Sequence, residues 1–387
     1  MAALSGLSGL TAFVRRAPAG GSPHRNLVLD YADDLKLFRG PWRKLGLGLL
    51  IFLYLWAPGY FSNYVLGVLT ICGVYAVGVI GLNLLTGYAG QVSLGHAFFF
   101  GAGGYAAAYL GAQRDWPMLL FLPAAALIGF VVGAVVGPFA LRLRGNYLVI
   151  VTLGLVFLGE HIWKTWDSVT GGGSGTSLRG ASVSIGGLDF RELEIAGSSY
   201  EKEQGMFWLV WAIVAIVALL AKNLVRSRAG RAMQAVRDRD LSAEVIGVNL
   251  ARYKVGAFAW SSALAALSGA LYGIVTNRLE TGIFTLFLSI TFVAMLIIGG
   301  VGTIFGSILG ALLVSGGQQL IARNSSAFVF DPIIIASPGD SGFLSIGEFN
   351  NILFGLFIVV FLMFEPRGLA ALWLRAKAWL LTWPFSY

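Results

Sequence analysis

The sequence predicts an all-α polytopic membrane protein with about ten transmembrane helices and both termini in the cytoplasm. Hydrophobic residues make up 57% of the 387 residues and charged residues only 12%, whereas a typical soluble domain has about 25% charged residues. This low charge suits a chain embedded in lipid, where ionisable groups are costly. The length of the uncharged runs and the placement of Lys and Arg between them support the same fold class.

The longest uncharged run lies between Lys44 and Arg114. It is too long for one crossing, because a membrane helix needs roughly 20 residues. Pro58 and the glycine-rich segment 86–90 divide it into three expected spans. The third of these, 92–111, is rich in Gly and Ser, so that a re-entrant segment suits it as well as a crossing does.

A second uncharged run of double length covers residues 281–322, and glycines at 299, 300 and 302 divide it into two expected spans. The remaining expected spans are single runs at 117–141, 145–166, 206–221, 255–277 and 349–364.

Lys and Arg are concentrated on one side of this ten-span arrangement. Segments 1–44, 142–144, 222–254 and 365–387 together carry a net charge of +13, and segments 167–203 and 323–348 together carry −5. Because basic residues are retained in the cytoplasm, the first group is expected to be cytoplasmic. The overall charge of +8 is therefore a topology signal, and no nucleic-acid partner is expected.

The predicted organisation follows from this sidedness. A cytoplasmic tail at 1–44 precedes a transmembrane domain at 45–364, and a cytoplasmic tail follows at 365–387. Within the transmembrane domain, 167–205 and 323–348 are expected to be external loops and 222–254 a cytoplasmic loop.

Chemistry-bearing motifs are scarce. The chain has no phosphate-binding Gly-x-x-x-x-Gly-Lys-Ser/Thr loop. Its three histidines, His24, His96 and His161, show no metal-ligand spacing with one another or with Cys72, the single cysteine. No catalytic residue, metal site or cofactor is therefore predicted, and an enzyme is not expected.

Two segments stand out by their polarity. Residues 81–96 place amide, hydroxyl and imidazole groups among glycines in an uncharged region, which is typical either of a broken helix that lines a transport path or of helix packing with internally bonded polar groups. Residues 229–249 alternate alanine and apolar residues with paired charges over a helical length. This pattern favours a short cytoplasmic helix that docks into a partner protein over a solvated basic loop.

A third segment, 163–175, ends in Thr-Gly-Gly-Gly-Ser-Gly. Its composition is typical of a flexible linker, and a substrate-contacting loop at the external mouth is the alternative.

Several motifs stand in a fixed order along the chain: Asn83-Leu-Leu-Thr-Gly-Tyr-Ala-Gly-Gln-Val-Ser-Leu-Gly-His-Ala-Phe, Arg144-Gly-x-Tyr-x-x-Ile-Val-Thr-Leu, Thr170-Gly-Gly, Ile298-Gly-Gly-Val-Gly-Thr-Ile-x-Gly and Glu365-Pro-Arg-Gly-Leu. Together they resemble the permeases of branched-chain amino acid ABC transporters, specifically the LivM type. The resemblance covers about residues 62–370 and leaves out the N-terminal tail; the insert at 331–347 is longer than the family pattern.

The resemblance implies a permease subunit of an ATP-driven importer for branched-chain amino acids in the cytoplasmic membrane of a prokaryote. The implied partners are a second homologous permease, two cytoplasmic ABC ATPases that hydrolyse the ATP, an extracytoplasmic substrate-binding protein and membrane lipid. Urea permeases of the same superfamily share these motifs, so an importer of urea or short amides stays open. An ATP-independent channel or carrier for a small neutral solute is a further alternative.

The resemblance also implies roles for individual residues. The expected ATPase-coupling residues are Arg231, Arg237, Asp238, Ala243, Glu244 and Gly247. The expected residues of the translocation path are Asn83, Thr86, Gly87, Gln91, Ser93, Gly95, His96 and Thr152.

Overall fold

The computed structural model describes residues 41–141, 147–195 and 198–323, short pieces between 334 and 363, and residues 368–382. Residues 1–40 of the predicted N-terminal tail and most of the predicted span at 349–364 lie outside these residues. The chain divides into two compact units, residues 1–55 and 56–387. Helix α3, Pro41–Tyr60, reaches from the first unit into the second. It continues through Pro58, where the sequence predicts a break, and ends two residues later.

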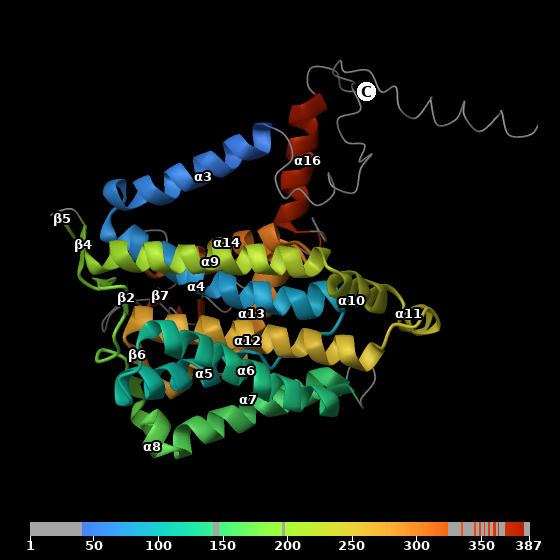
Figure 1. The fold of residues 1–387 in the computed structure, drawn as a ribbon, viewed down its shortest axis with the longest axis horizontal. Helices are drawn as coiled ribbons and strands as arrows, with labels where there is room; N and C mark the ends of the chain where they lie inside the picture. Colours follow the sequence, from blue (N-terminus) through green and yellow to red (C-terminus); the bar gives the residue numbers. More distant parts are fainter. Residues whose placement is uncertain are drawn as a thin grey trace, which may run out of the picture. The chain divides into compact units, whose positions relative to one another are not determined.

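The second unit is a bundle of long helices (Figure 1). Helices α4 and α5 each end in a wider π-helical turn, η1 and η2 respectively. The longer helices are α4 (Asn63–Asn83) with η1 (Leu84–Tyr88), α5 (His96–Ala107) with η2 (Ala108–Gln113), α6 (Met118–Leu141), α7 (Tyr147–Thr165), α9 (Lys202–Arg226), α12 (Leu250–Thr276), α13 (Leu286–Gly299), α14 (Ile304–Arg323) and α16 (Leu369–Thr382).

Five helices of the described residues are long and apolar enough to cross a membrane: 63–88, 118–138, 148–165, 202–226 and 250–276. Helices α13 and α14 meet this test together and are bent by 119° at their junction, so they add a sixth span if counted as one. The prediction of a mostly helical, polytopic membrane protein is thus confirmed, and the number of ten spans stays a prediction.

Helix α12 lies at the centre of the bundle and packs against α4, α5 and α6. Small residues bring these helices close together. A Cβ atom at Gly103 of α5 would collide with the backbone of Ala266, and one at Gly269 of α12 would collide with the backbone of Phe100. Close backbone approach through small residues is typical of helix association in lipid, where tight packing replaces the hydrophobic driving force.

Helix α14 lies along α4 in the antiparallel direction. The hydroxyl of Tyr64 donates to the carbonyl of Gln319 (2.8 Å) near the start of α4. At the other end, Asn83 donates to the carbonyl of Thr303 (2.9 Å). Residue numbers that rise on one helix fall on the other, so the two helices run side by side in opposite directions.

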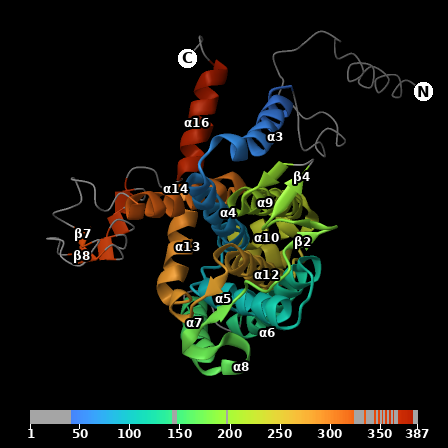
Figure 2. The same cartoon turned by 90° about the vertical axis from the view of Figure 1, so that its left-hand side faces the viewer.

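The connections at the two ends of the bundle differ. In Figure 1 the strands lie at one end and the short helices α10 (Arg228–Asp238) and α11 (Asp240–Val245) at the other. Figure 2 views the bundle from the strand end, with α4 and α12 in its middle. The described strands form four two-stranded ladders. Three are antiparallel: β1 (Thr176–Ser177) with β6 (Arg278–Leu279), β2 (Ser184–Ile185) with β3 (Leu188–Asp189), and β4 (Leu193–Ile195) with β5 (Ser198–Tyr200). The fourth, β7 (Ile334–Ile335) with β8 (Leu344–Ser345), is parallel.

Candidate functional site

Local sequence explains why the loop between α9 and α12 forms two short helices. The side chain of Ser227 accepts from the Gly230 N–H and caps α10, satisfying a free donor of the first turn. Arg239 is extended and separates α10 from α11. Gly247, with φ of 87°, then ends α11, because its left-handed conformation favours glycine. The helical structure that the alanine and charge pattern of 229–249 predicts is therefore present, as the two helices α10 and α11.

The two sides of this helix pair differ in exposure. Met233, Val236 and Ala243 face the protein and are buried. On α11 and the turn after it, Leu241, Val245 and Ile246 are 79%, 88% and 74% exposed. Three neighbouring apolar side chains exposed to this degree in a basic loop are typical of a protein or membrane interaction surface. We call these three residues the α11 patch.

Arg237, at the end of α10, joins this helix to the bundle. Its guanidinium Nη1 donates to the carbonyl of Gly87 at 2.6 Å, and its Nε lies 3.2 Å from Asp238 Oδ1. Gly87 belongs to the π-helical turn η1; π-helical turns occur frequently at functional sites. Gly90, with φ of 70°, lets the backbone after η1 lie close to Arg237, since a Cβ atom at Gly90 would lie 2.7 Å from Arg237 Cγ.

Asn83 connects the same region to the break between α13 and α14. Its Nδ2 donates to the Thr303 carbonyl and to Ser307 Oγ, both at 2.9 Å, and its Oδ1 accepts from the Gly302 N–H at 2.8 Å. Asn83 is 1% exposed, so these bonds satisfy an amide that would otherwise be costly to bury. We call the group of Asn83, Gly87, Arg237, Gly302 and Thr303 the Arg237 joint.

The remaining expected path residues bond within the chain. Thr86 Oγ1 donates to the carbonyl of Gln91 (3.0 Å), and Ser93 Oγ accepts from the Gly95 N–H (3.2 Å). His96 Nε2 lies 2.8 Å from the carbonyl of Gly78 in α4.

Thr152 of α7 closes the turn before α5. Its Oγ1 accepts from the Leu94 N–H at 3.0 Å, and a Cβ at Gly95 would lie 3.1 Å from Thr152 Cβ. Asn83, Gln91, Ser93, His96 and Thr152 are all buried. The two interpretations of segment 81–96, a transport path and internally bonded helix packing, both allow these bonds within the chain.

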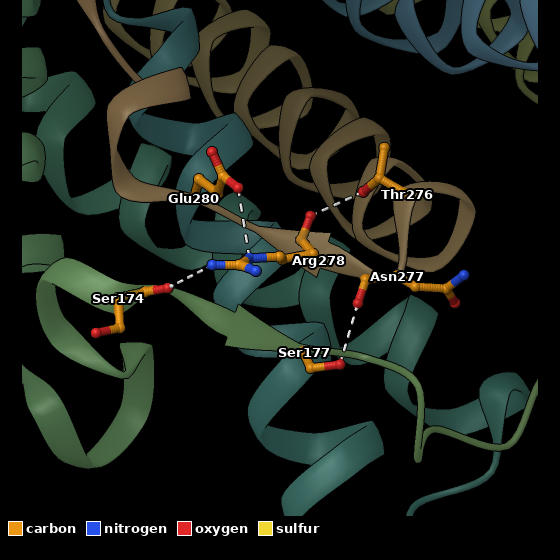
Figure 3. A network of polar contacts seen from close by, with 6 residues as sticks. All are labelled: Ser174, Ser177, Thr276, Asn277, Arg278 and Glu280. Carbon is orange, nitrogen blue, oxygen red and sulfur yellow. Dashed lines mark hydrogen bonds and ion pairs between the residues drawn. The ribbon is translucent and has the colours of Figure 1, made fainter.

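The strand end has its own polar network (Figure 3). Ser177 Oγ donates to the carbonyl of Asn277 (3.2 Å), and Arg278 lies between the Ser174 carbonyl and the Glu280 carboxylate, each at 3.4 Å. Asn277 is left-handed, with φ of 59°, and ends α12. These contacts bind the loop after α7 to the end of α12.

The glycine-rich end of segment 163–175 is a bonded turn. Thr170 Oγ1 donates to the carbonyls of Trp163 and Trp166 (2.8 Å each), and Gly171, Gly172 and Gly175 have positive φ. The flexible-linker interpretation of this segment is therefore wrong. Its glycines serve the backbone conformation of the turn.

Arg191 organises the rest of this loop. Its guanidinium donates to the carbonyls of Leu178, Arg179 and Ala181 at 2.6–2.9 Å. Burial lowers the pKa of Arg191 from its ordinary value, and neighbouring Asp189 opposes this effect. Arginine stays charged in proteins, so its role here is to hold three backbone carbonyls together.

Comparison with known proteins identifies the family of this chain. The family model for the permease component of branched-chain amino acid transport systems matches residues 64–362. The chain belongs to this family. The permease is a transport component of an ABC system and not an enzyme.

Named relatives cover most of the permease. It is 26% identical over 340 residues to the high-affinity branched-chain amino acid transport permease LivM of Escherichia coli, covering 84% of this chain and 75% of the relative. It is 28% identical over 315 residues to BraD of Pseudomonas aeruginosa, covering 78% and 92%. LivH of Escherichia coli is 25% identical over 285 residues, covering 70% and 87%. No solved structure matches the chain.

The structure groups the expected site residues in a way that sequence reasoning missed. Asn83 and Gly87, expected in a path, lie with Arg237, expected in coupling, at one joint. Ala243 is buried, whereas Arg231, Asp238, Glu244 and Gly247 are exposed beside it. The expectation also left out Thr303, Ser307 and the α11 patch. The leucine and valine within the charged 222–254 loop were the available signal for that patch.

Proposed function

We propose that the permease imports branched-chain amino acids, with α10 and α11 as the coupling element that an ABC ATPase grips from the cytoplasm. The α11 patch carries this proposal, because three exposed apolar side chains stand beside buried Ala243 on a helix pair that projects from the bundle. The relatives named LivM, LivH and BraD support the substrate class. The chain's own net charge of +5 over 222–254 supports the cytoplasmic side.

The turns between successive helices lie at alternate ends of the bundle, which supports the ten-span topology. Gly87, Gly302 and Arg237 meet at the α10 end, where the topology expects cytoplasmic turns. The opposite end carries the β1–β6 ladder that joins two expected external segments.

The third predicted span is proposed to cross the membrane rather than turn back. It begins beside Thr152, near the start of α7. It ends at η2, where a Cβ at Gly111 would lie 3.1 Å from Ala181 Cβ in the external loop. The 12 α-helical residues 96–107 extend roughly 18 Å at 1.5 Å per residue, and the six π-helical residues 108–113 lengthen the segment further towards the roughly 30 Å hydrocarbon thickness of a bilayer.

The Arg237 joint gives the coupling element a mechanical connection. When the ATPases close, the shift of α10 reaches η1 through the Arg237–Gly87 bond and reaches the α13–α14 break through Asn83. Packed helix interfaces change between discrete arrangements, so this shift exposes the path to one side of the membrane or the other. The second homologous permease completes the path, and the expected path residues 83–96 and Thr152 act at its inner end.

Reconstitution tests the function. Proteoliposomes that contain this chain, the second permease and both ATPases are expected to take up labelled leucine only when ATP and the substrate-binding protein are present. Uptake of urea in preference to leucine would favour the urea importer. Uptake by this chain alone, without ATP, would favour the channel or carrier.

The α11 patch makes a specific prediction for partner binding. Leu241→Asp is expected to weaken the affinity of the ATPase by about tenfold or more, because it places a charge in a desolvated apolar contact. Co-purification of the ATPases with the permease and titration of the ATPase onto permease in nanodiscs measure the loss. Leu188→Asp, the same change at an exposed leucine of the external loop, is the control. Equal ATPase affinity of Leu241→Asp and wild type would contradict docking at this patch.

A further inference from the structure

A cavity of ≈ 420 Å³ lies at the strand end of the bundle, between α4, α9, α12 and α14. Its lining includes the first residues of α4 and α9 and the last residue of α12, which places it at the end opposite α10. Under the topology proposed above, this is the external end. The volume lies within the roughly 300–1,000 Å³ typical of small-molecule pockets.

The lining combines an apolar wall with two opposite charges. Val68, Ile71 and Met206 supply apolar surface, and Lys202 and Glu203 contribute charged side chains at the start of α9. Lys202 Nζ donates to the carbonyl of Val275 at 3.4 Å. Within the described part of the chain, neither Lys202 nor Glu203 forms an ion pair. A cation and an anion are therefore available on the same side of an apolar pocket.

This combination matches a zwitterion with an apolar side chain. An α-amino acid carries its carboxylate and ammonium on one carbon, and a cation and an anion on adjacent residues satisfy both groups. The apolar wall then receives an aliphatic side chain. We propose that this pocket is an external entry subsite for a zwitterionic amino acid with a branched aliphatic side chain. The inference rests on the proposed function and adds to it a site within this subunit.

Gly67 provides the sharpest test, because it lines the pocket and a Cβ there would meet no atom within 4 Å. Gly67→Leu therefore fills the pocket without a backbone collision. Gly154 of α7 likewise has nothing within 4 Å of its Cβ, is exposed and lies outside the pocket. Gly154→Leu is thus the matched control for adding a leucine to a membrane helix.

In the reconstituted complete transporter, Gly67→Leu and Lys202→Met are each expected to lower the initial rate of leucine uptake about tenfold. Gly67→Leu removes the space for the substrate, and Lys202→Met removes its charged partner. Gly154→Leu is expected to keep the wild-type rate. Wild-type rates in both pocket variants would overturn the subsite. A lowered uptake rate in Gly67→Leu together with normal rates in Lys202→Met and Glu203→Gln would also overturn the subsite. A pocket that depends on its space but not on its charges holds an uncharged chain, such as a lipid tail.

A labelling experiment tests the pocket independently of transport. Val68→Cys is expected to react with a membrane-impermeant maleimide added from outside, and leucine without binding protein is expected to slow this reaction, whereas urea is not. The wild type is the blank, because its only cysteine, Cys72, is buried. If wild-type transporter fails to import leucine, the proposed function fails, but leucine protection of Val68→Cys still supports the subsite. Absence of protection overturns the subsite even where wild-type uptake is normal.

Discussion

Replacing Arg237 by glutamate is expected to abolish leucine uptake while leaving the abundance of the permease in the membrane unchanged. The wild-type guanidinium donates to the Gly87 carbonyl at 2.6 Å. A carboxylate at this position cannot donate and would instead repel that carbonyl and the neighbouring Asp238. The connection between α10 and η1 would be lost, so that movement of the ATPases no longer reaches the helices.

The measurement is ATP-driven uptake in proteoliposomes, read together with the ATPase activity of the same vesicles. ATP hydrolysis is expected to continue without transport, which separates lost coupling from lost assembly. Arg228→Glu is the control, because Arg228 is an exposed arginine at the start of the same helix. Uptake at the wild-type rate in Arg237→Glu would show that the joint does not transmit the movement.

Gly247→Trp is likewise expected to abolish leucine uptake while leaving the abundance of the permease unchanged, but for another reason. A Cβ at Gly247 would meet no atom within 4 Å, so the substitution meets no steric collision inside the permease. With φ of 87°, however, a side chain strains the turn that ends α11, at a cost of roughly 1–2 kcal/mol. The bulky ring would also stand beside the α11 patch, where the ATPase is expected to bind.

Replacing Asn83 by leucine is the second change with a large expected effect. It removes the three hydrogen bonds that hold the α13–α14 break against α4, and it leaves the part-buried Gly302 N–H without its acceptor. An unsatisfied buried polar group costs about 1–3 kcal/mol. Leucine is also bulkier than asparagine, and Gly87 lies directly against the Asn83 side chain, since a Cβ atom added at Gly87 would collide with Asn83 Oδ1.

We expect Asn83→Leu to lower the midpoint of thermal unfolding in detergent and to reduce uptake severely. Thr291→Val is the control, because buried Thr291 donates to the carbonyl of Phe287 (2.9 Å) within its own helix. Asn83→Asp distinguishes the donor from the acceptor, since it keeps the acceptor for Gly302 and loses the donor to Thr303. A thermal midpoint and uptake rate for Asn83→Leu equal to those of Thr291→Val would mean that the helix break does not depend on this amide.

The local features of the fold were accessible from the sequence because they depend on neighbouring residues. The uncharged runs predicted the helices, and the glycines at 299–302 predicted the break between α13 and α14. The alanine and charge pattern of 229–249 predicted a helical element there. At 170–175 the composition predicted a flexible linker, but the glycines there adopt the positive φ angles of a hydrogen-bonded turn.

The amino-acid sequence by itself determined the class of protein and the positions of the apolar helices in the described residues, whereas the cytoplasmic side of the basic loop stays a prediction. Hydropathy, glycine punctuation and charge act over short stretches, and they need no knowledge of which helices become neighbours. The tertiary structure decided that Arg237 reaches Gly87 across 150 residues and that Lys202 and Glu203 border a cavity with Gly67. Such contacts arise only when α4, α9, α10, α12 and α14 have packed, because long-range helix packing, rather than local propensity, sets which side chains meet.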